Sequence, residues 1–317
     1  MRVLIFGALG QDGLFLSELL ITRGAEVFGF VRQNSVISLS NSISGVTYIK
    51  GNLLDRKDIE KAIELAKPDA IYNLASLSSV KSSIDFPHLS LNINQNFVYE
   101  LLDILKELQN AGNVPIKFLQ ASSSEMYGPI QEFPINEGSK FNPVSPYALH
   151  KANAHLAVIQ SREKDFLHCS TAILFNHESY RRSPLFASRK ITQSAYRIAT
   201  GKQEFLELGN IETFRDWGFA GDYVEAMLMI VEATNPSDYV ISTGKLMTLS
   251  DICEIAFDEV GISDWHPYIR INEELIRKND LSGITGDSSK IKNELGWIAK
   301  TPFEDVIRDM VSRENLL

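Results

Sequence analysis

Residues 3–13, VLIFGALGQDG, decide the fold, because a short apolar run passes directly into three glycines spaced three residues apart. Residues 3–8 predict a buried strand and residues 12–23 an amphipathic helix. Gly7, Gly10 and Gly13 form G-x-x-G-x-x-G, a variant of the dinucleotide fingerprint G-x-G-x-x-G. Such glycines permit a tight turn and a close backbone approach to a pyrophosphate at the helix N-terminus. Alone, they are also compatible with a plain strand–helix turn.

The alternation of strands and helices continues through the first half of the chain. Helices are expected at 56–66, at 92–109 and from Pro146 onward, and further strands at 26–31, 46–53, 70–75, 116–123 and 168–175. Helical segments between strands indicate parallel βαβ units. We therefore predict an α/β fold with a doubly wound parallel sheet of the Rossmann type, formed by residues 1–175 and joined again by 220–245.

The regular alternation of strands and helices ends after residue 175. Residues 176–225 are rich in Arg, Asn and aromatic residues and are interpreted as a loop-rich stretch, whereas the C-terminal part is interpreted as helix and loop. Residues 176–219 and 246–317 are therefore predicted to form a smaller, discontinuous α+β domain that binds the substrate.

The composition excludes several classes of protein. The chain has 317 residues, of which 44% are hydrophobic and 22% are charged, as in ordinary globular proteins. No apolar run approaches the ~18–20 residues that span a bilayer. The formal charge of −9 disfavours nucleic acid as a partner. Cys169 and Cys253 lack the spacing of metal ligands, so we expect no metal and two reduced thiols in a cytoplasmic protein.

The end of the second predicted strand bears on the choice of cofactor. An NAD enzyme usually carries Asp or Glu there, to hold the ribose 2′-hydroxyl. This chain has Arg32 in FGFVRQNS, and an arginine accommodates a 2′-phosphate. The prediction is therefore NADP, with a solvated turn residue as the alternative role for Arg32.

Two further motifs carry catalytic residue types. In SPYALHK (145–151), Ser145 and Pro146 suit the start of a helix, which places Tyr147 and Lys151 on one face. A cation beside a phenol is expected to lower the pKa of that phenol and make it a base. In FLQASSSEMYG (118–128), Ser123 and Glu125 follow a predicted parallel strand, where such sheets bind ligands. When each motif is considered alone, the Y-x-x-x-K spacing also fits a plain amphipathic helix, and the serine run also fits a helix cap or turn.

Taken together, these motifs are similar to the extended short-chain dehydrogenases/reductases, and within them to the GDP-mannose 4,6-dehydratase family. The resemblance rests on GALGQDG, NLASLSSV, QASSSEMYG, SPYALHK, ILFNHESYRR, LGNIETFRDWG and YVEAM, and extends to GDSSKIKNELGW. FNHES and RDWG are far more specific than the glycines.

The resemblance implies a reaction without net redox change. Tyr147, with Lys151 and Ser123, would take the proton of the sugar C4 hydroxyl while a hydride passes to NADP⁺. Glu125 would then take the C5 proton, water would leave from C6, and the hydride would return to C6. The product would be a nucleotide 4-keto-6-deoxy sugar. A sugar-nucleotide epimerase or 4-ketoreductase needs no second base, so Glu125 separates the dehydratase from these alternatives.

The resemblance also implies the binding residues. The cofactor would contact Gly7, Gly10, Gln11, Asp12, Gly13, Arg32, Asn52, Leu53, Leu74, Ser76, Ser78, Tyr147, Lys151, His177 and Arg182. The GDP-sugar substrate would contact Ser78, Ser123, Glu125, Asn176, Lys190, Arg215 and Arg277. Guanidinium groups hold phosphate oxygens bidentately, which suits the last two arginines to a diphosphate.

Three departures from the family pattern leave alternatives open. Asn52 replaces an aspartate that precedes leucine. Gln33, Asn34 and Ser35 with a short loop replace a second arginine and a longer loop that reaches a neighbouring subunit, so a homodimer through 92–109 and 146–162 stands beside a homotetramer. Residues 277–282 depart from R-P-x-E-x-D, so GDP-N-acetylglucosamine or a GDP-heptose stands beside GDP-mannose. A catalytically silent NADP-binding scaffold is the alternative outside enzymes.

Overall fold

The chain builds a seven-stranded sheet in which all strands run parallel. The computed structural model describes residues 1–38, 41–129, 133–276 and 283–316. The strand order is β3-β2-β1-β4-β5-β6-β10, with bounds β1 Arg2–Phe6, β2 Glu26–Arg32, β3 Val46–Gly51, β4 Ala70–Asn73, β5 Lys117–Ser123, β6 Cys169–Leu174 and β10 Asp238–Ile241. The order reverses between β1 and β4, which is where doubly wound sheets bind ligands. The predicted fold class is confirmed.

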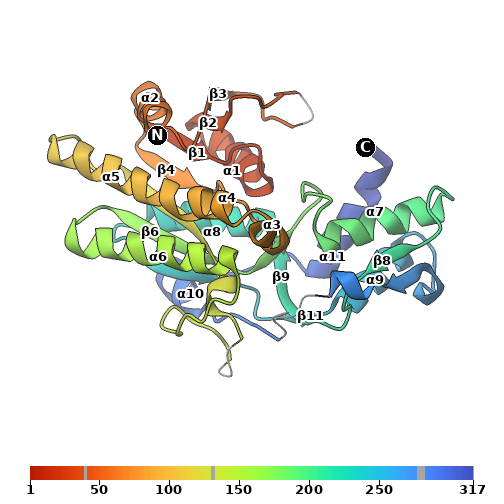
Figure 1. Cartoon of the computed structure of the whole chain (residues 1–317). Helices are drawn as coiled ribbons and strands as arrows, with labels where there is room; N and C mark the ends of the chain where they lie inside the picture. Colours follow the sequence, from red (N-terminus) through yellow and green to blue (C-terminus); the bar gives the residue numbers. More distant parts are fainter. Residues whose placement is uncertain (39–40, 130–132, 277–282, 317) are drawn as a thin grey trace.

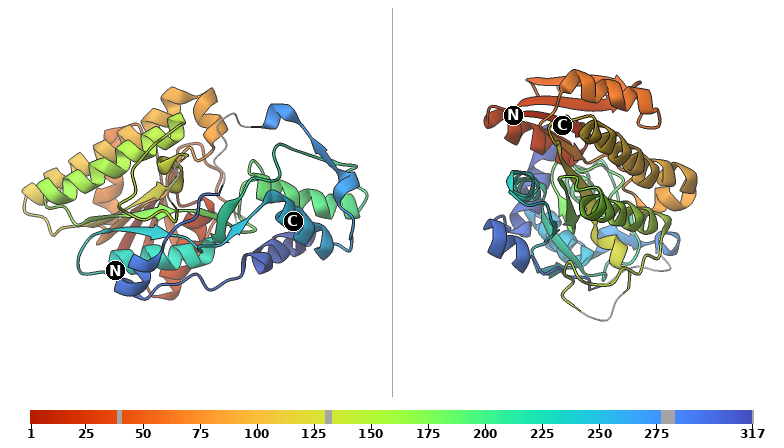
Figure 2. Two further views of the ribbon diagram at one scale, coloured as in Figure 1. Left: turned by 90° about the horizontal axis from the view of Figure 1, so that it is seen from below. Right: turned by 90° about the vertical axis from the view of Figure 1, so that its left-hand side faces the viewer.

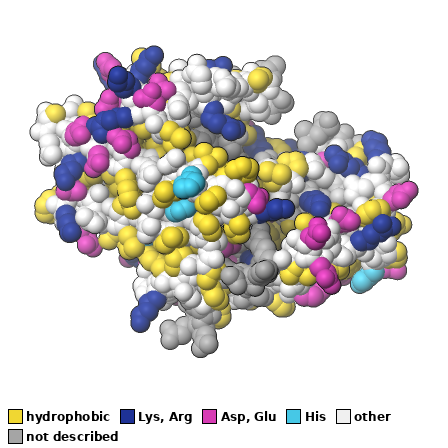
Figure 3. Space-filling model, viewed as in Figure 1, with side chains coloured by type: hydrophobic (Ala, Val, Ile, Leu, Met, Phe, Trp, Pro, Cys, Tyr) yellow, Lys and Arg dark blue, Asp and Glu magenta, His cyan; other side chains and the backbone are white. Residues whose placement is uncertain are grey.

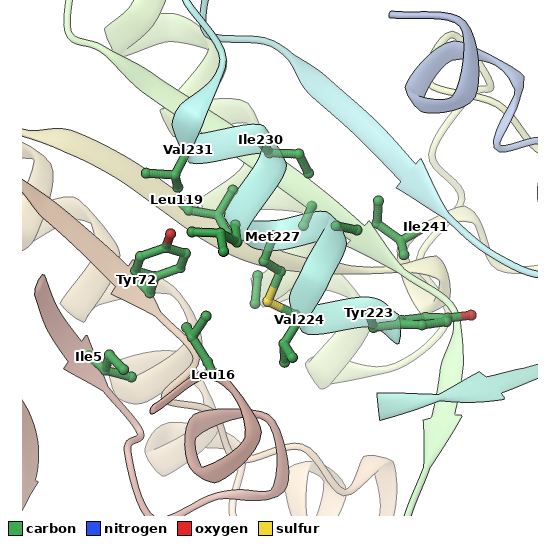
Figure 4. Close-up of a cluster of buried hydrophobic side chains, with 14 of the residues drawn as sticks. Ile5, Leu16, Tyr72, Leu119, Tyr223, Val224, Met227, Ile230, Val231 and Ile241 are labelled. Carbon is green, nitrogen blue, oxygen red and sulfur yellow. The ribbon is translucent and has the colours of Figure 1, made fainter. Parts of the chain in front are cut away.

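Both faces of this sheet are buried under helices, because alternate strand residues point to opposite sides. Val3 and Ile5 face α1 (Gln11–Thr22), α8 (Ala220–Glu232) and α10 (Ser289–Leu295). Leu4 and Phe6 face α2 (Arg56–Ala66), α5 (Phe97–Asn110) and α6 (Pro146–Lys164). Figure 2 shows the resulting three layers, and Figure 4 shows side chains of α1 and α8 meeting those of the strands. This packing explains why the strands read as continuous apolar runs.

The segment before α5 is more irregular than the sequence predicts. The expected helix 92–109 is preceded by α3 (Val80–Asp85) and α4 (Pro87–Leu91) and begins as a π-helix, Asn92–Asn96. A π-helical turn often marks a functional site. Here it places the buried side chain of Asn94 against residues 76–77, in the segment that follows β4.

The remaining elements form a second cluster with its own core. β7 (Asn176–Glu178), β9 (Arg215–Phe219) and β11 (Leu246–Met247) make a three-stranded sheet, and β8 (Leu206–Leu208) pairs with β12 (Ile269–Ile271). Helices α7 (Ala187–Ala199), α9 (Leu249–Glu259) and α11 (Phe303–Ser312) pack against these strands. Figure 1 shows them to the right of the large sheet. The mixed α and β content agrees with expectation, whereas the proposed domain boundaries stay a prediction.

The interpretation of residues 176–225 as loop-rich is wrong. That segment contains β7, α7, β8 and β9, and α8 begins at Ala220. The helix α7 escaped prediction because its buried side is half polar: Ser188, Arg189, Thr192 and Ser194 lie on it beside three apolar residues. Internal partners, such as Glu178 for the Ser188 hydroxyl, allow these polar groups to be buried.

Short 3-10 helices complete the structure, at Ser124–Tyr127, His266–Tyr268, Glu273–Leu275 and Arg313–Leu316. Over the described residues, the helices are all too short or too polar to cross a membrane.

Candidate active site

A cleft of about 270 Å³ opens at the C-terminal ends of β1, β4, β5 and β6. It brings together most of the predicted site: Gly7, Gly10, Gln11, Asp12, Gly13, Leu74, Ser76, Ser78, Ser123, Glu125, Tyr147, Lys151, Asn176, His177 and Arg182. Sequence reasoning missed other lining residues, namely Val80, Ala121, Ser122, Ser124, Leu174, Phe175 and Phe186. Several of these directly precede or follow predicted residues at strand ends, which is the signal that would have found them.

Other predicted residues lie outside the lining of this cleft. Arg32 is exposed at the end of β2, beside β1, and Asn52 and Leu53 follow the end of β3. Lys190 and Arg215 belong to the second cluster, on α7 and at the start of β9. Arg277 lies outside the described residues.

The first glycine loop is shaped to bring backbone close to a ligand. Gly7 has φ +86°, a left-handed conformation that favours glycine, and a Cβ there would lie 2.7 Å from the Ala75 nitrogen. A Cβ on Gly13 would lie 2.3 Å from the Gly7 oxygen. The glycines therefore let the loop pack tightly against the strand ends, with the N-terminus of α1 at the cleft, an arrangement that fits a dinucleotide pyrophosphate.

Tyr147 and Lys151 occupy the first turns of α6, as predicted. Ser145 caps the helix by accepting a hydrogen bond from the Ala148 nitrogen, and Pro146 is its first residue. The Lys151 amine lies 6.0 Å from the centre of the Tyr147 ring and donates to the Ala121 oxygen at 2.6 Å. Burial lowers the pKa of Lys151 to about 8, although the negative charge of Asp12 acts to raise it.

The predicted lowering of the Tyr147 pKa is wrong, because the pKa of this phenol is raised. Burial raises the pKa of this phenol to about 12, although hydrogen bonds with Ser123 and Ser76 and the charge of Arg182 lower it. The amine of Lys151 is turned to a backbone carbonyl instead, so its charge does not offset the cost of burying a phenolate.

Ser123 and Glu125 flank the end of β5. The Ser123 hydroxyl caps the following 3-10 helix by accepting from the Glu125 nitrogen at 3.3 Å. This turn directs half-buried Glu125 to the same cleft as Ser123 and Tyr147, and the charge of Glu125 raises the pKa of the Tyr147 phenol. A carboxylate and a phenol therefore share one small space.

Ser76 is held in place by Asn94 of the π-helix, a residue that sequence reasoning missed. The Ser76 hydroxyl donates to Asn94 Oδ1 at 2.9 Å, and the Leu77 nitrogen donates to the same oxygen at 3.0 Å. Asn94 Nδ2 donates in turn to the Ser90 hydroxyl at 3.1 Å. The run NINQN, polar within an apolar helix, was the available signal.

Comparisons with known proteins agree with this geometry. The model of the family described as GDP-mannose 4,6 dehydratase matches residues 4–310. The chain belongs to this family. GDP-mannose 4,6 dehydratase 1 of Arabidopsis thaliana is 36% identical over 98% of the chain and 89% of its own length. The enzyme of Drosophila melanogaster is 36% identical, over 98% and 85%. A UDP-glucose 4-epimerase of Thermotoga maritima has the same fold, with a TM-score of 0.87 at 23% identity over both whole chains.

Family membership confirms the resemblance and the predicted activity. The reaction it supports is GDP-mannose 4,6-dehydration, a carbon–oxygen lyase reaction of deoxysugar biosynthesis that depends on a nicotinamide cofactor, consistent with NADP. The epimerase, the reductase and the dehydratases of other GDP-sugars are not favoured.

Proposed function

We propose that the cleft converts GDP-mannose to GDP-4-keto-6-deoxymannose, with Ser123, Glu125, Tyr147 and Lys151 as the catalytic residues. The observation that carries this assignment is the presence of Glu125 beside the Ser123–Tyr147–Lys151 set in one cleft. Hydride exchange needs only a serine, a tyrosine and a lysine, whereas elimination of water needs a further acid–base group.

Tyr147 acts in the first half of the reaction. Its phenolate takes the proton of the C4 hydroxyl, while Ser123 positions that hydroxyl by a hydrogen bond. When bound, the oxidised nicotinamide accepts the C4 hydride, returns it later, and carries a positive charge that favours the phenolate. Lys151, whose amine lies 6.0 Å from the centre of the Tyr147 ring, would hold the ribose of the cofactor.

Glu125 acts in the second half. The C4 ketone acidifies the C5 proton, which Glu125 removes as a base. The same carboxyl group then gives this proton to the C6 hydroxyl, which leaves as water. Tyr147 then gives C5 the proton that it took from the C4 hydroxyl, while the bound nicotinamide would supply the hydride to C6. Electrons and protons balance, so the cofactor ends as it began.

The remaining ligand assignments involve residues outside the catalytic set. Arg32 lies at the end of β2, next to β1, and suits the 2′-phosphate of NADP. Asn52 and Leu53 would receive the adenine, and the cleft residues would hold the nicotinamide half. Asn176, Lys190, Arg215 and Arg277 would bind the GDP-sugar.

Isotope labelling tests the proposed reaction. GDP-mannose with deuterium on C4 is incubated with the protein and catalytic NADP, and the product is examined by NMR and mass spectrometry. We expect a 4-keto sugar with deuterium on C6 and no net change in reduced cofactor. Retention of deuterium on C4, or consumption of one NADPH per turnover, would contradict the proposal.

We also propose that the enzyme is a cytoplasmic homodimer. Ile84, Phe86, Leu89, Leu149 and Leu156 expose apolar side chains over α3, α4 and α6, beside Tyr99 of α5, and Figure 3 shows hydrophobic side chains gathered on this side of the molecule. A two-fold axis would bury this surface against its own copy. The two buried free thiols support a reducing compartment. Light scattering of the protein and of Leu149→Glu tests the assembly, since the variant should be monomeric.

A further inference from the structure

The glycine loop is tied to β7 by side chains on both sides of the cleft. Gln11 Nε2 donates to the His177 carbonyl at 3.1 Å, and the Ser179 hydroxyl donates to Gln11 Oε1 at 2.8 Å. His177 Nε2 lies 3.1 and 3.0 Å from the two carboxylate oxygens of Asp12. The motif GALGQDG therefore pairs with FNHES through adjacent residues, although more than 160 positions separate them.

The geometry and the pKa shifts of its two groups together indicate the charge of this contact. His177 Nδ1 is 2.7 Å from the Phe175 carbonyl, which only accepts, so that nitrogen carries a proton. Nε2 faces Asp12, whose pKa is lowered by His177 despite burial, so the carboxyl group is ionised and Nε2 carries a proton as well. The contact is thus an imidazolium–carboxylate pair, and the His177 ring also stacks on Tyr223 at 4.7 Å between centres. Burial lowers the pKa of His177, but the facing Asp12 outweighs burial and raises it overall.

These contacts occupy the polar groups that the sequence assigned to the cofactor. Gln11 uses both ends of its amide within the protein, and Asp12 is engaged by the imidazolium. A carboxylate beside the α1 N-terminus would also repel a pyrophosphate unless a cation neutralised it. Gln11, Asp12 and His177 therefore have a positioning role in addition to lining the cleft.

The two sides of the contact carry different ligands under the proposed function. On one side, Gly10 and Gly13 form the cofactor loop. On the other, Asn176, which is assigned to the GDP-sugar, precedes His177 on β7, and Glu178 follows it. Glu178 accepts from Ser188 of α7 at 2.7 Å, so the network reaches the helix that carries Lys190.

We propose that Gln11, Asp12, His177 and Ser179 form a latch that couples cofactor binding to GDP-sugar binding. The inference rests on the proposed function, because that function assigns the two ligands to the two sides. A ligand that orders the glycine loop orders β7 through the latch, and the second ligand then binds a prepared site. By linkage, each ligand raises the affinity for the other by the same factor.

The test measures this factor with a pair that does not react, NADPH and GDP. The dissociation constant of GDP is determined by calorimetry on cofactor-free protein, with and without saturating NADPH, and then in the reciprocal order. We expect roughly 5- to 50-fold coupling in the wild type, within the usual range for linked sites. Asp12→Asn and His177→Gln should each bring the factor close to one, and the double variant should lose little more.

A control separates the latch from general damage to the fold. Asp238→Asn breaks another largely buried ion pair, with Arg162, which lies outside the lining of the cleft, and should keep the coupling. Ser179→Ala, which removes one hydrogen bond, should lower the factor partly and serves if the charge variants do not fold. Wild-type protein that binds both ligands without coupling would overturn the latch and leave the reaction intact. Full coupling in Asp12→Asn or Ser179→Ala would overturn it too. Failure to bind GDP at all would instead contradict the proposed function.

Discussion

The large sheet and the second cluster are built in opposite ways. In the sheet, β1, β3, β4 and β5 are each followed by helical segments, and apolar residues on alternate positions fill the two cores. In the second cluster, strands of two to five residues from distant parts of the chain meet, and α7, α9 and α11 cover them. The sheet therefore offers a rigid edge for chemistry, and the cluster offers several separate segments that surround a ligand.

Buried polar groups sharpen this contrast. Asp216 of β9 is 1% exposed and accepts from the Thr243 and Gly244 nitrogens at 2.9 Å and from the Gly286 nitrogen at 3.2 Å. One carboxylate thus holds together its own strand and two segments that lie 27 and 70 residues further along the chain. The difference teaches that periodic apolar packing organises the first part, whereas the second adds specific polar contacts to its own apolar core. We infer that catalysis belongs to the first part and the grip on the nucleotide to both.

The largest expected effect tests whether the chemistry resides at the sheet edge. Tyr147→Phe removes the hydroxyl that takes the C4 proton and should lower kcat by about 10⁴-fold, the upper range for a general base. The dissociation constant of GDP should change little, because the ring and its packing remain. Stopped-flow absorbance with GDP-mannose and bound NADP should show no reduced cofactor. A normal burst of reduced cofactor would remove Tyr147 from this role.

Glu125→Gln should have the next largest effect and separate the two halves of the reaction. The amide keeps the size of the side chain but accepts no proton, so kcat should fall by about 10³-fold. The first hydride transfer needs only Ser123, Tyr147 and Lys151, so reduced cofactor should accumulate in a burst. Asp85→Asn, an exposed carboxylate of α3, is the control and should turn over normally. Unchanged turnover in Glu125→Gln would leave the elimination without its base.

The fold of the first part was predictable because its physics is periodic. Strands such as 26–31 and 168–175 were placed within a residue or two, since apolar runs between helical segments have few other solutions. Residues 80–91 and α7 were not recognised as helices. The first is short and interrupted by Pro87, and the second buries Ser188, Arg189 and Thr192 against partners that lie far away in the chain.

The sequence predicted which residues meet in the site better than it predicted their pKa values and charge pairing. The glycine spacing and the Y-x-x-x-K pair placed residues that do meet in one cleft. The pKa of Tyr147 went the other way, because burial and the orientation of the Lys151 amine depend on the tertiary structure. The pairing of Asp12 with His177 was equally hidden, since nothing in either motif indicates the other as its partner.

A smaller effect is expected when the second cluster binds the nucleotide of the substrate less tightly. Arg215→Met removes a guanidinium at the start of β9 and should raise the KM for GDP-mannose by about 10- to 100-fold, the worth of hydrogen bonds to a charged group. Affinity for NADPH and the transfer of label from C4 to C6 should be unaffected. Arg308→Met, on a partly exposed arginine that pairs with Asp258 and Glu259, should leave KM unchanged. A loss of NADPH affinity in Arg215→Met would break the division between the two parts.

The smallest effect concerns the free energy of unfolding and tests whether the buried charge of Lys151 destabilises the folded protein. Lys151 is 4% exposed, and burial lowers its pKa to about 8 from an ordinary 10.5. At pH 7 the folded protein must therefore keep a buried ammonium that the unfolded chain holds in water. Lys151→Met should abolish activity yet raise the free energy of unfolding at pH 7 by about 2 kcal/mol, allowing for the lost bond to the Ala121 carbonyl.

The pH dependence gives this prediction its sign. Between pH 8 and 10.5 the unfolded wild type binds more protons at Lys151 than the folded protein does, so this group makes wild-type stability rise with pH. The advantage of Lys151→Met, measured by urea unfolding of cofactor-free protein, should therefore shrink across that range. Lys61→Met, on an exposed lysine of α2, should show no such trend. A variant less stable than the wild type at pH 7 would mean that the hydrogen bond to Ala121 outweighs the burial of the charge, and that the catalytic lysine stabilises the fold it serves.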